Sequence, residues 1–389
     1  FVFFFFFQAE DGIRAAMVTG GALYTPPGLV VLDKDPEPGG KPLEFVDVPH
    51  MCEKNRAIME ALVQETVQQV YQTYESYKSR IDVFYVAFSG GKDSVVALDM
   101  VLRALPHEAF KVVFGDTDME FPTTLALIND IRDDCKENGI TFIHAKSQMR
   151  SLDSWKVFGP PSRRIRWCCT VHKTAPVINK LCELYGFNNL HAMMTTGVRA
   201  EESFARSSYD MISMGKKLEG QYSFHPLLYW SSAEIFLHIF GNHLRLNEAY
   251  KLGFNRVGCI ICPNSSERHE YMKKCSFPDL VKAYTDIIAE TCAKDLSGDN
   301  RKRFFEIGAW KTRLSGRELK FSEEERFQFQ EKSGKLIFEV KNLNDDWKQW
   351  YKTMGDMVQD DQGYLLEYKK VWRRCVLQTG AKNAFIIDN

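Results

Sequence analysis

DVFYVAFSGGKDS, residues 82–94, is the stretch that decides the fold. Its first part, residues 82–88, is a short apolar run rich in β-branched and aromatic residues, which is typical of a strand buried on both faces. Its second part, Ser89-Gly90-Gly91-Lys92-Asp93-Ser94, leads into a helix-like stretch at residues 95–105. Glycines permit a tight turn there, and amide groups at a helix N-terminus bind anions. We therefore expect these residues to bind phosphate, the alternative being an ordinary strand-to-helix turn.

Strand-like and helix-like stretches alternate around this segment. Strands are expected at residues 82–88, 111–115, 140–144 and 191–196, and helices at residues 52–77, 95–105 and 123–138. This rhythm predicts an α/β fold in which a parallel sheet is flanked by helices on both faces. Ser231-Ser232-Ala233-Glu234 has the pattern of a capping box, so a further helix is expected through Phe240.

The two ends of the chain differ from this central part. Residues 1–16 open with a phenylalanine-rich run that resembles translated adapter sequence, so we expect the natural chain to start at Met17; a buried edge strand is the alternative. We interpret residues 17–80 as an N-terminal arm and helix, residues 81–295 as the main domain, and residues 296–389 as a mixed C-terminal extension.

Composition excludes several classes of protein. With 389 residues, 44% of them hydrophobic, the chain is neither disordered nor collagen-like. Its net charge of −1 gives no global argument for a nucleic-acid or membrane partner, and no apolar run approaches the 18 residues of a membrane span. Because no credible signal peptide is present, a reducing compartment and a cytoplasmic protein are expected, so clusters among the ten cysteines indicate metal or redox chemistry and not disulfides.

Four of the cysteines form two close pairs, Cys168-Cys169 and Cys259-Ile260-Ile261-Cys262. Thiolates in such a set hold either a tetrahedral zinc ion or an iron–sulfur cluster. Adjacent cysteines are an awkward pair of ligands for one small ion, whereas a cubane offers them separate iron atoms. The alternative is four cysteines that are simply buried in an apolar core.

Charged residues near these motifs suit a polyanionic nucleotide. Arg163, Arg164 and Arg166 precede the cysteine pair and Lys173 follows it, and guanidinium groups bind phosphate or sulfate through two parallel hydrogen bonds. A solvated run of charges is the competing interpretation for each arginine. Asp93 and Asp116 are candidate contacts to Mg²⁺ or ribose, with capping of a helix start and a strand end as the alternative.

The loop at residues 89–94 resembles the PP-loop of adenine-nucleotide α-hydrolases, and the chain resembles the branch that contains phosphoadenosine phosphosulfate (PAPS) reductases. The resemblance covers roughly residues 80–280. The segments that carry it are Asp116-Thr117-Asp118-Met119-Glu120-Phe121-Pro122, Cys168-Cys169 with Lys173 and Pro176, Gly197-Val198-Arg199 with Ser203, Pro226-Leu227 with Trp230, and Gly253 to Pro263.

This resemblance implies a Rossmann-like PP-loop domain with a [4Fe–4S] cluster on Cys168, Cys169, Cys259 and Cys262, rather than zinc. It also implies that ATP with Mg²⁺, or adenylyl sulfate (APS) or PAPS, binds at Ser89, Gly90, Gly91, Lys92, Asp93, Ser94 and Asp116. The same resemblance makes Lys92, Asp93, Lys173 and Arg199 the expected catalytic residues.

The sequence departs from the sulfonucleotide reductases at two points. Its loop is intact where theirs is eroded, and Cys375 lacks the glycine and histidine that accompany their nucleophile. Both departures favour an enzyme that cleaves ATP at the α–β bond and adenylates an acceptor for sulfur transfer, similar to DNA phosphorothioation and tRNA thiolation enzymes. A nucleic-acid acceptor and a sulfur donor such as a cysteine desulfurase are then the expected partners. A genuine APS or PAPS reductase, which would be an oxidoreductase, and a nucleotide- or redox-sensing module are the alternatives.

Overall fold

The computed structural model describes residues 47–186, 190–214 and 220–313, and the backbone of six further strands between Gln328 and Asp388. The phenylalanine-rich start and most of the N-terminal arm therefore lie outside the described residues. No helix in the described part of the chain is long and apolar enough to cross a membrane.

A six-stranded sheet forms the centre of the described molecule, with strand order β3-β2-β1-β4-β6-β5. All neighbours are parallel except β5 and β6, which pair in antiparallel orientation. The bounds of the strands are β1 Val83–Ala87, β2 Lys111–Asp116, β3 Thr141–Lys146, β4 Ala192–Thr195, β5 Ile212–Met214 and β6 Gln221–Phe224. The expected parallel sheet is confirmed for its first four strands, whereas the antiparallel edge was not predicted.

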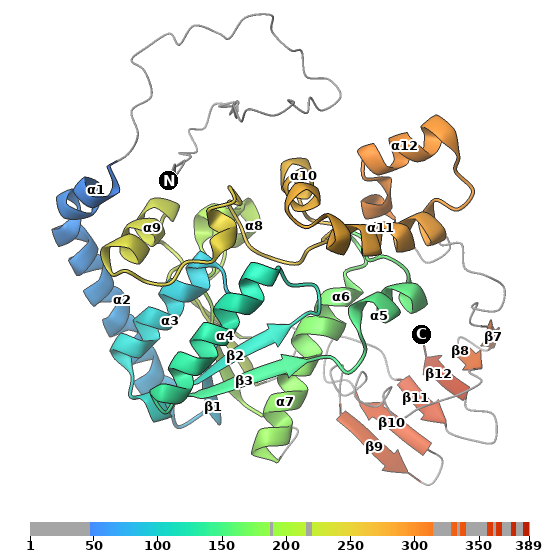
Figure 1. Ribbon diagram of the computed structural model, residues 1–389. Helices are drawn as coiled ribbons and strands as arrows, with labels where there is room; N and C mark the ends of the chain where they lie inside the picture. Colours follow the sequence, from blue (N-terminus) through green and yellow to red (C-terminus); the bar gives the residue numbers. More distant parts are fainter. Residues whose placement is uncertain are drawn as a thin grey trace, which may run out of the picture.

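Helices cover both faces of this sheet, as the alternating pattern predicts (Figure 1). Along β1, Phe84 and Val86 face one core with helices α2, α3, α4 and α9, while Val83 and Tyr85 face a second core against α7. The bounds of these helices are α2 Arg56–Tyr77, α3 Lys92–Ala104, α4 Pro122–Glu137, α7 Ala175–Tyr185 and α9 Ser232–Gly241. Because β1 is buried on both sides, an uninterrupted apolar run is what its position requires.

Local sequence explains where several helices begin. A short helix α1, Val48–Lys54, precedes α2, and Asn55 separates the two, so the single helix expected at residues 52–77 is interrupted. The capping box at Ser231 is confirmed, because its hydroxyl accepts the Glu234 amide and the Glu234 carboxylate accepts the Ser231 amide. Both contacts satisfy amide groups that have no partner within the helix.

A third core packs against Cys168 and Cys259, one cysteine of each pair. It packs Trp155, Ile260, Tyr284 and Trp310 together, so α12 and the turn after it share a core with α11. The elements of this region are α5 Ser151–Phe158, α6 Trp167–Cys169, a π-helix Thr170–Thr174, α10 Glu267–Ser276, α11 Pro278–Cys292, α12 Gly298–Glu306 and a 3₁₀ turn Ala309–Thr312.

Shorter elements complete the description. They are the 3₁₀ turns His107–Ala109, Ala200–Glu202 and Glu248–Tyr250 and helix α8 Phe204–Ser207. A second sheet of six antiparallel strands occupies the C-terminal extension in the order β7-β8-β12-β11-β10-β9. Its strands are β7 Gln328–Lys332, β8 Lys335–Glu339, β9 Asp356–Asp360, β10 Gly363–Glu367, β11 Cys375–Gln378 and β12 Ala384–Asp388. This sheet was not expected from the sequence.

Candidate active site

The phosphate loop connects the end of β1 to the start of α3 and is held by side chains from distant parts of the chain. Gly90 has a φ of +71°, and an added Cβ there would lie 2.9 Å from Cγ2 of Thr124. The Asn247 amide donates to the Gly90 carbonyl at 3.1 Å, and the Ser94 hydroxyl donates to the Gly91 carbonyl at 2.8 Å. Only glycine combines this backbone conformation with so close a neighbour.

The backbone amides of this loop point to an anion site. Within the described part of the chain, no protein acceptor lies on the amides of Gly90, Gly91 and Asp93. The Lys92 amide donates to the Tyr250 hydroxyl at 2.9 Å. These groups lie at the N-terminus of α3, where the partial positive charge of the helix adds to their attraction for phosphate.

Three of the expected catalytic side chains meet beside the loop. Asp93 accepts from Nζ of Lys92 at 2.8 Å through one carboxylate oxygen and from Nε of Arg199 at 2.6 Å through the other. Arg199 also pairs with Glu201. Burial opposes the charge of the guanidinium, but the two carboxylates raise the pKa of Arg199 above its ordinary value. The loop therefore carries a buried network of two cations and a shared carboxylate.

Asp116 ends β2, the parallel neighbour of β1, and so lies at the same edge of the sheet as the loop. Its carboxylate contacts Nε2 of His144 at 2.9 Å and Nζ of Lys146 at 3.3 Å, and accepts the Asp118 amide at 2.8 Å. Burial favours the neutral acid, but these contacts hold the pKa of Asp116 below its usual value. Asp116 is thus an ionised carboxylate with its charge partly neutralised.

The fold brings the two cysteine pairs together across 90 positions of sequence. The neighbouring Cys169, burial and the charges of Cys259 and Cys262 together raise the pKa of Cys168. The Thr117 hydroxyl lies 3.5 Å from Sγ of Cys259 and links this thiol to the segment after β2. None of the four cysteines forms a disulfide in the described structure, so all four sulfur atoms are available as donors.

The chemistry of this donor set fits an iron–sulfur cluster. No group of three or more His, Cys, Asp or Glu side chains among the described residues is arranged to hold a metal ion as the side chains stand. A tetrahedral zinc ion would require sulfur atoms about 3.8 Å apart, given Zn–S bonds of about 2.3 Å. A cluster binds its four thiolates through separate iron atoms, so their sulfur atoms can lie farther apart than those around one zinc ion.

The remaining basic candidates lie on the cysteine side. Lys173 is exposed and makes no hydrogen bond or ion pair with Lys92, Asp93 or Arg199 in the described structure. Its charge acts instead on Cys259 and on Glu120, where it lowers the pKa against the effect of burial. Arg163, Arg164 and Arg166 are exposed, and Nε of Arg163 donates to the Pro263 carbonyl at 3.2 Å.

The sequence motifs did not identify the side chains that hydrogen-bond to the phosphate loop and to Thr117. Asn247 and Tyr250 contact the loop from more than 150 positions away and have no motif of their own. Glu120 lies within a segment that the sequence had singled out, and its carboxylate accepts the Thr117 hydroxyl at 2.7 Å. Thr117 therefore connects the half-buried Glu120 carboxyl group to the cysteine set.

The sequence of this chain matches one family model and two uncharacterised archaeal proteins. Residues 61–265 match the family model of the phosphoadenosine phosphosulfate reductase domain. An uncharacterised protein of Methanocaldococcus jannaschii is 30% identical over 265 residues, which are 67% of this chain and 52% of that protein. A second protein of that organism is 26% identical, and the chain spans 58% of it. The chain therefore spans somewhat more than half the length of these relatives.

Relatives with a stated activity match over a shorter stretch of this chain. An adenosine 5′-phosphosulfate reductase of Staphylococcus epidermidis is 25% identical over 200 residues, 51% of this chain and 75% of that enzyme. Among solved structures, PAPS reductase from Candida auris in complex with phosphate has a TM-score of 0.38 at 20% identity, over 57% of this chain and 98% of that one. A U34-tRNA thiolase from Methanococcus maripaludis has a TM-score of 0.33 at 13% identity, over 59% and 80% of the two chains.

Proposed function

This chain belongs to the phosphoadenosine phosphosulfate reductase domain family, and from that premise we propose that it uses ATP to adenylate an acceptor for sulfur transfer. The observation that carries the proposal is the intact loop at residues 89–94, with unpaired amides at the N-terminus of α3 and a buried lysine beside them. Such a site accommodates the β and γ phosphates of ATP, which a sulfonucleotide substrate lacks. ATP is therefore the nucleotide that this loop fits best.

The reaction would begin with attack of an acceptor oxygen on the α-phosphorus of ATP. The bond from this phosphorus to the α–β bridging oxygen breaks, pyrophosphate leaves, and the acceptor proton passes to solvent. Loop amides and the Lys92 ammonium would stabilise the negative charge that develops on pyrophosphate. Arg199 would hold Asp93 in place, and Asp93 and Asp116 are the carboxylates proposed to contact Mg²⁺ on the phosphates or the ribose.

The second half of the reaction would take place beside the cysteines. Cys168, Cys169, Cys259 and Cys262 would hold a [4Fe–4S] cluster, which would supply one-electron redox chemistry beside the acceptor. A donor protein, with a thiol as reductant, would supply sulfur at the sulfide level as hydrosulfide. The hydrosulfide would attack the adenylated acceptor, the bond to the activated oxygen would break, and that oxygen would leave with AMP. Exposed Lys173 and the three arginines before the cysteines would attract an anionic acceptor, for which we propose a nucleic acid.

Release of pyrophosphate from ATP tests this proposal. We expect the anaerobically purified protein to release pyrophosphate, and the Lys92→Ala variant to do so about 10²–10³-fold more slowly, as when one transition-state donor is removed. Lys78→Ala is the matched control, since Lys78 is an exposed lysine paired with Glu75 on α2. Unchanged pyrophosphate release in Lys92→Ala would contradict the assignment of the loop.

A second candidate function is reduction of APS or PAPS. It is favoured by the relatives that carry the name adenosine 5′-phosphosulfate reductase at about a quarter identity. Its nucleophile would be Cys375, which begins strand β11, or a residue outside this chain. Release of sulfite from APS or PAPS with a thiol donor, without turnover of ATP, would favour this activity. Tight binding of ATP without any product would favour a sensing module.

A further inference from the structure

Lys273 is a buried lysine whose ammonium group contacts the segment that carries Cys259 and Cys262. It lies on α10, and 2% of the residue is exposed. Its Nζ donates to the Cys259 carbonyl and to the Ser265 hydroxyl, both at 2.8 Å, and lies 5.8 Å from the centre of the Phe121 ring. The Ser265 amide in turn donates to the Cys262 carbonyl at 3.0 Å. Lys273 is therefore tied to both ends of the Cys259–Cys262 segment.

The charge of Lys273 has no carboxylate partner within ion-pair distance among the described residues. Glu270, one turn earlier on α10, pairs instead with Nζ of Lys311 at 2.7 Å. A buried ammonium without a counter-charge is strongly unfavourable, so this position requires negative charge nearby.

We propose that Lys273 is the counter-charge of the four-cysteine site and raises the reduction potential of the cluster bound there. The inference rests on the iron–sulfur cluster of the proposed function. A [4Fe–4S] centre with four thiolates is an anion that becomes more negative on reduction, so a fixed positive charge in a poorly hydrated core stabilises the reduced form more. Four neutral thiols would give no reason to bury this lysine.

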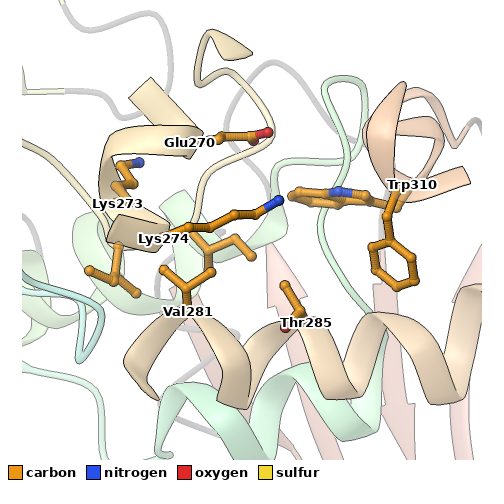
Figure 2. Close-up of a pocket in the computed structure, with 9 residues that line it drawn as sticks. Glu270, Lys273, Lys274, Val281, Thr285 and Trp310 are labelled. Atoms are coloured by element: carbon orange, nitrogen blue, oxygen red, sulfur yellow. The ribbon is translucent and has the colours of Figure 1, made fainter. Parts of the chain in front are cut away.

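The adjacent Lys274 provides a matched control. Figure 2 shows that the two lysines leave α10 in different directions, with Lys274 extending across a small pocket toward Trp310. Lys274 is exposed, so water and salt screen its charge. Two side chains that are neighbours in the sequence thus differ in whether their charge acts on the cysteine site.

The test is a redox titration of the anaerobically purified protein, followed by the electron paramagnetic resonance signal of the reduced cluster. We expect Lys273→Gln, which keeps a hydrogen-bond donor and loses the charge, to shift the reduction equilibrium at least tenfold toward the oxidised form, a lowering of 59 mV for one electron. Lys273→Arg, Lys274→Gln and Ser265→Ala should stay within threefold of the wild type. An unchanged potential in Lys273→Gln, or an equal shift in Ser265→Ala, would overturn the inference.

If Lys273→Gln does not retain its cluster, its potential cannot be titrated, and the iron and acid-labile sulfide content of each variant becomes the measurement. Lys273→Arg should then retain the wild-type content, and loss of the cluster in both variants alike would overturn the inference. A wild-type protein that binds neither iron nor sulfide would refute the cluster together with the role of Lys273. A cluster-containing wild type with an unaltered Lys273→Gln variant would refute only the latter, while pyrophosphate release reports separately on the loop.

Discussion

The pairing of Asp93 with Arg199 is the residue-scale contact that joins the phosphate loop to the segment after β4. The Arg199 side chain is 3% exposed, so its removal leaves the buried side of the Asp93 carboxylate without its strongest partner. We expect Arg199→Ala to lower the free energy of unfolding by about 3 kcal/mol. Arg206→Ala, which removes a more exposed pair with Glu202, should cost about 1 kcal/mol or less. Urea unfolding measures both, and equal losses would contradict this account.

His172 makes the stability of the fold depend on pH. Its side chain is fully buried, Nε2 is 2.7 Å from the Ser154 hydroxyl, and burial lowers its pKa to about 4. Above pH 6.5 the imidazole is neutral in both the folded and unfolded states and contributes nothing. Between pH 6.5 and 4 only the unfolded state takes up the proton, so the free energy of unfolding should fall by about 3 kcal/mol from this residue.

The pH dependence of urea unfolding for the wild type and His172→Gln tests this expectation. The variant has no imidazole to titrate, so its stability should decline less steeply between pH 6.5 and 4. Carboxylates and other histidines contribute equally to both proteins, which isolates the contribution of His172. Parallel curves for the two proteins would show that His172 does not titrate as its burial requires.

At the scale of elements, the sequence predicts strands and loops whose conformation depends on neighbouring residues. It does not predict strands and contacts that depend on residues far away in the chain. The strand at β1 is evident because both of its faces are buried, which demands a continuous apolar run. Strands β5 and β6 were missed because they are short and mostly half-buried, and because the pairing of β6 with β4 and of β5 with β6 decides their conformation. The loop residues were predicted, whereas Asn247 and Tyr250 reach the loop only through the fold.

Gly197 sets the distance between the Arg199 segment and the first turn of α3. A Cβ added at this position would lie 2.4 Å from the carbonyl oxygen of Asp93, which is part of the backbone and cannot turn aside. We expect Gly197→Ala to displace the phosphate loop, to cost about 1–3 kcal/mol in stability and to weaken ATP binding more than tenfold. Gly258→Ala is the control, because nothing lies within 4 Å of an added Cβ there. Calorimetric titration with ATP measures the difference, and equal affinities would contradict it.

At the scale of the whole molecule, the proposed nucleotide site and the cysteine site belong to different cores. The loop rests on the core formed by α2, α3, α4 and α9, whereas the cysteines lie against the core around Trp155 and Trp310. The segment after β2 connects the two, since Asp116 lies at the sheet edge and Thr117 contacts Cys259. Sequence motifs identified both groups of residues, but their meeting depends on long-range packing that no local pattern encodes.

Because the two sites belong to different cores, we expect removal of iron to destabilise the core around the cysteines and not the sheet. If the four thiols hold a cluster, its binding free energy stabilises the cysteine core and not the sheet. Anaerobic chelation should therefore speed hydrogen exchange at the Ile260 amide, which donates to the Met119 carbonyl at 2.6 Å, by at least about tenfold. Amides that join β1 to β2, in the register Val86 opposite Val112, should keep their protection. Hydrogen exchange with mass spectrometry compares the two regions within one sample. Equal loss of protection in both would show that the molecule responds as one unit, and no loss in either would show that the cysteines contribute no metal-dependent stability.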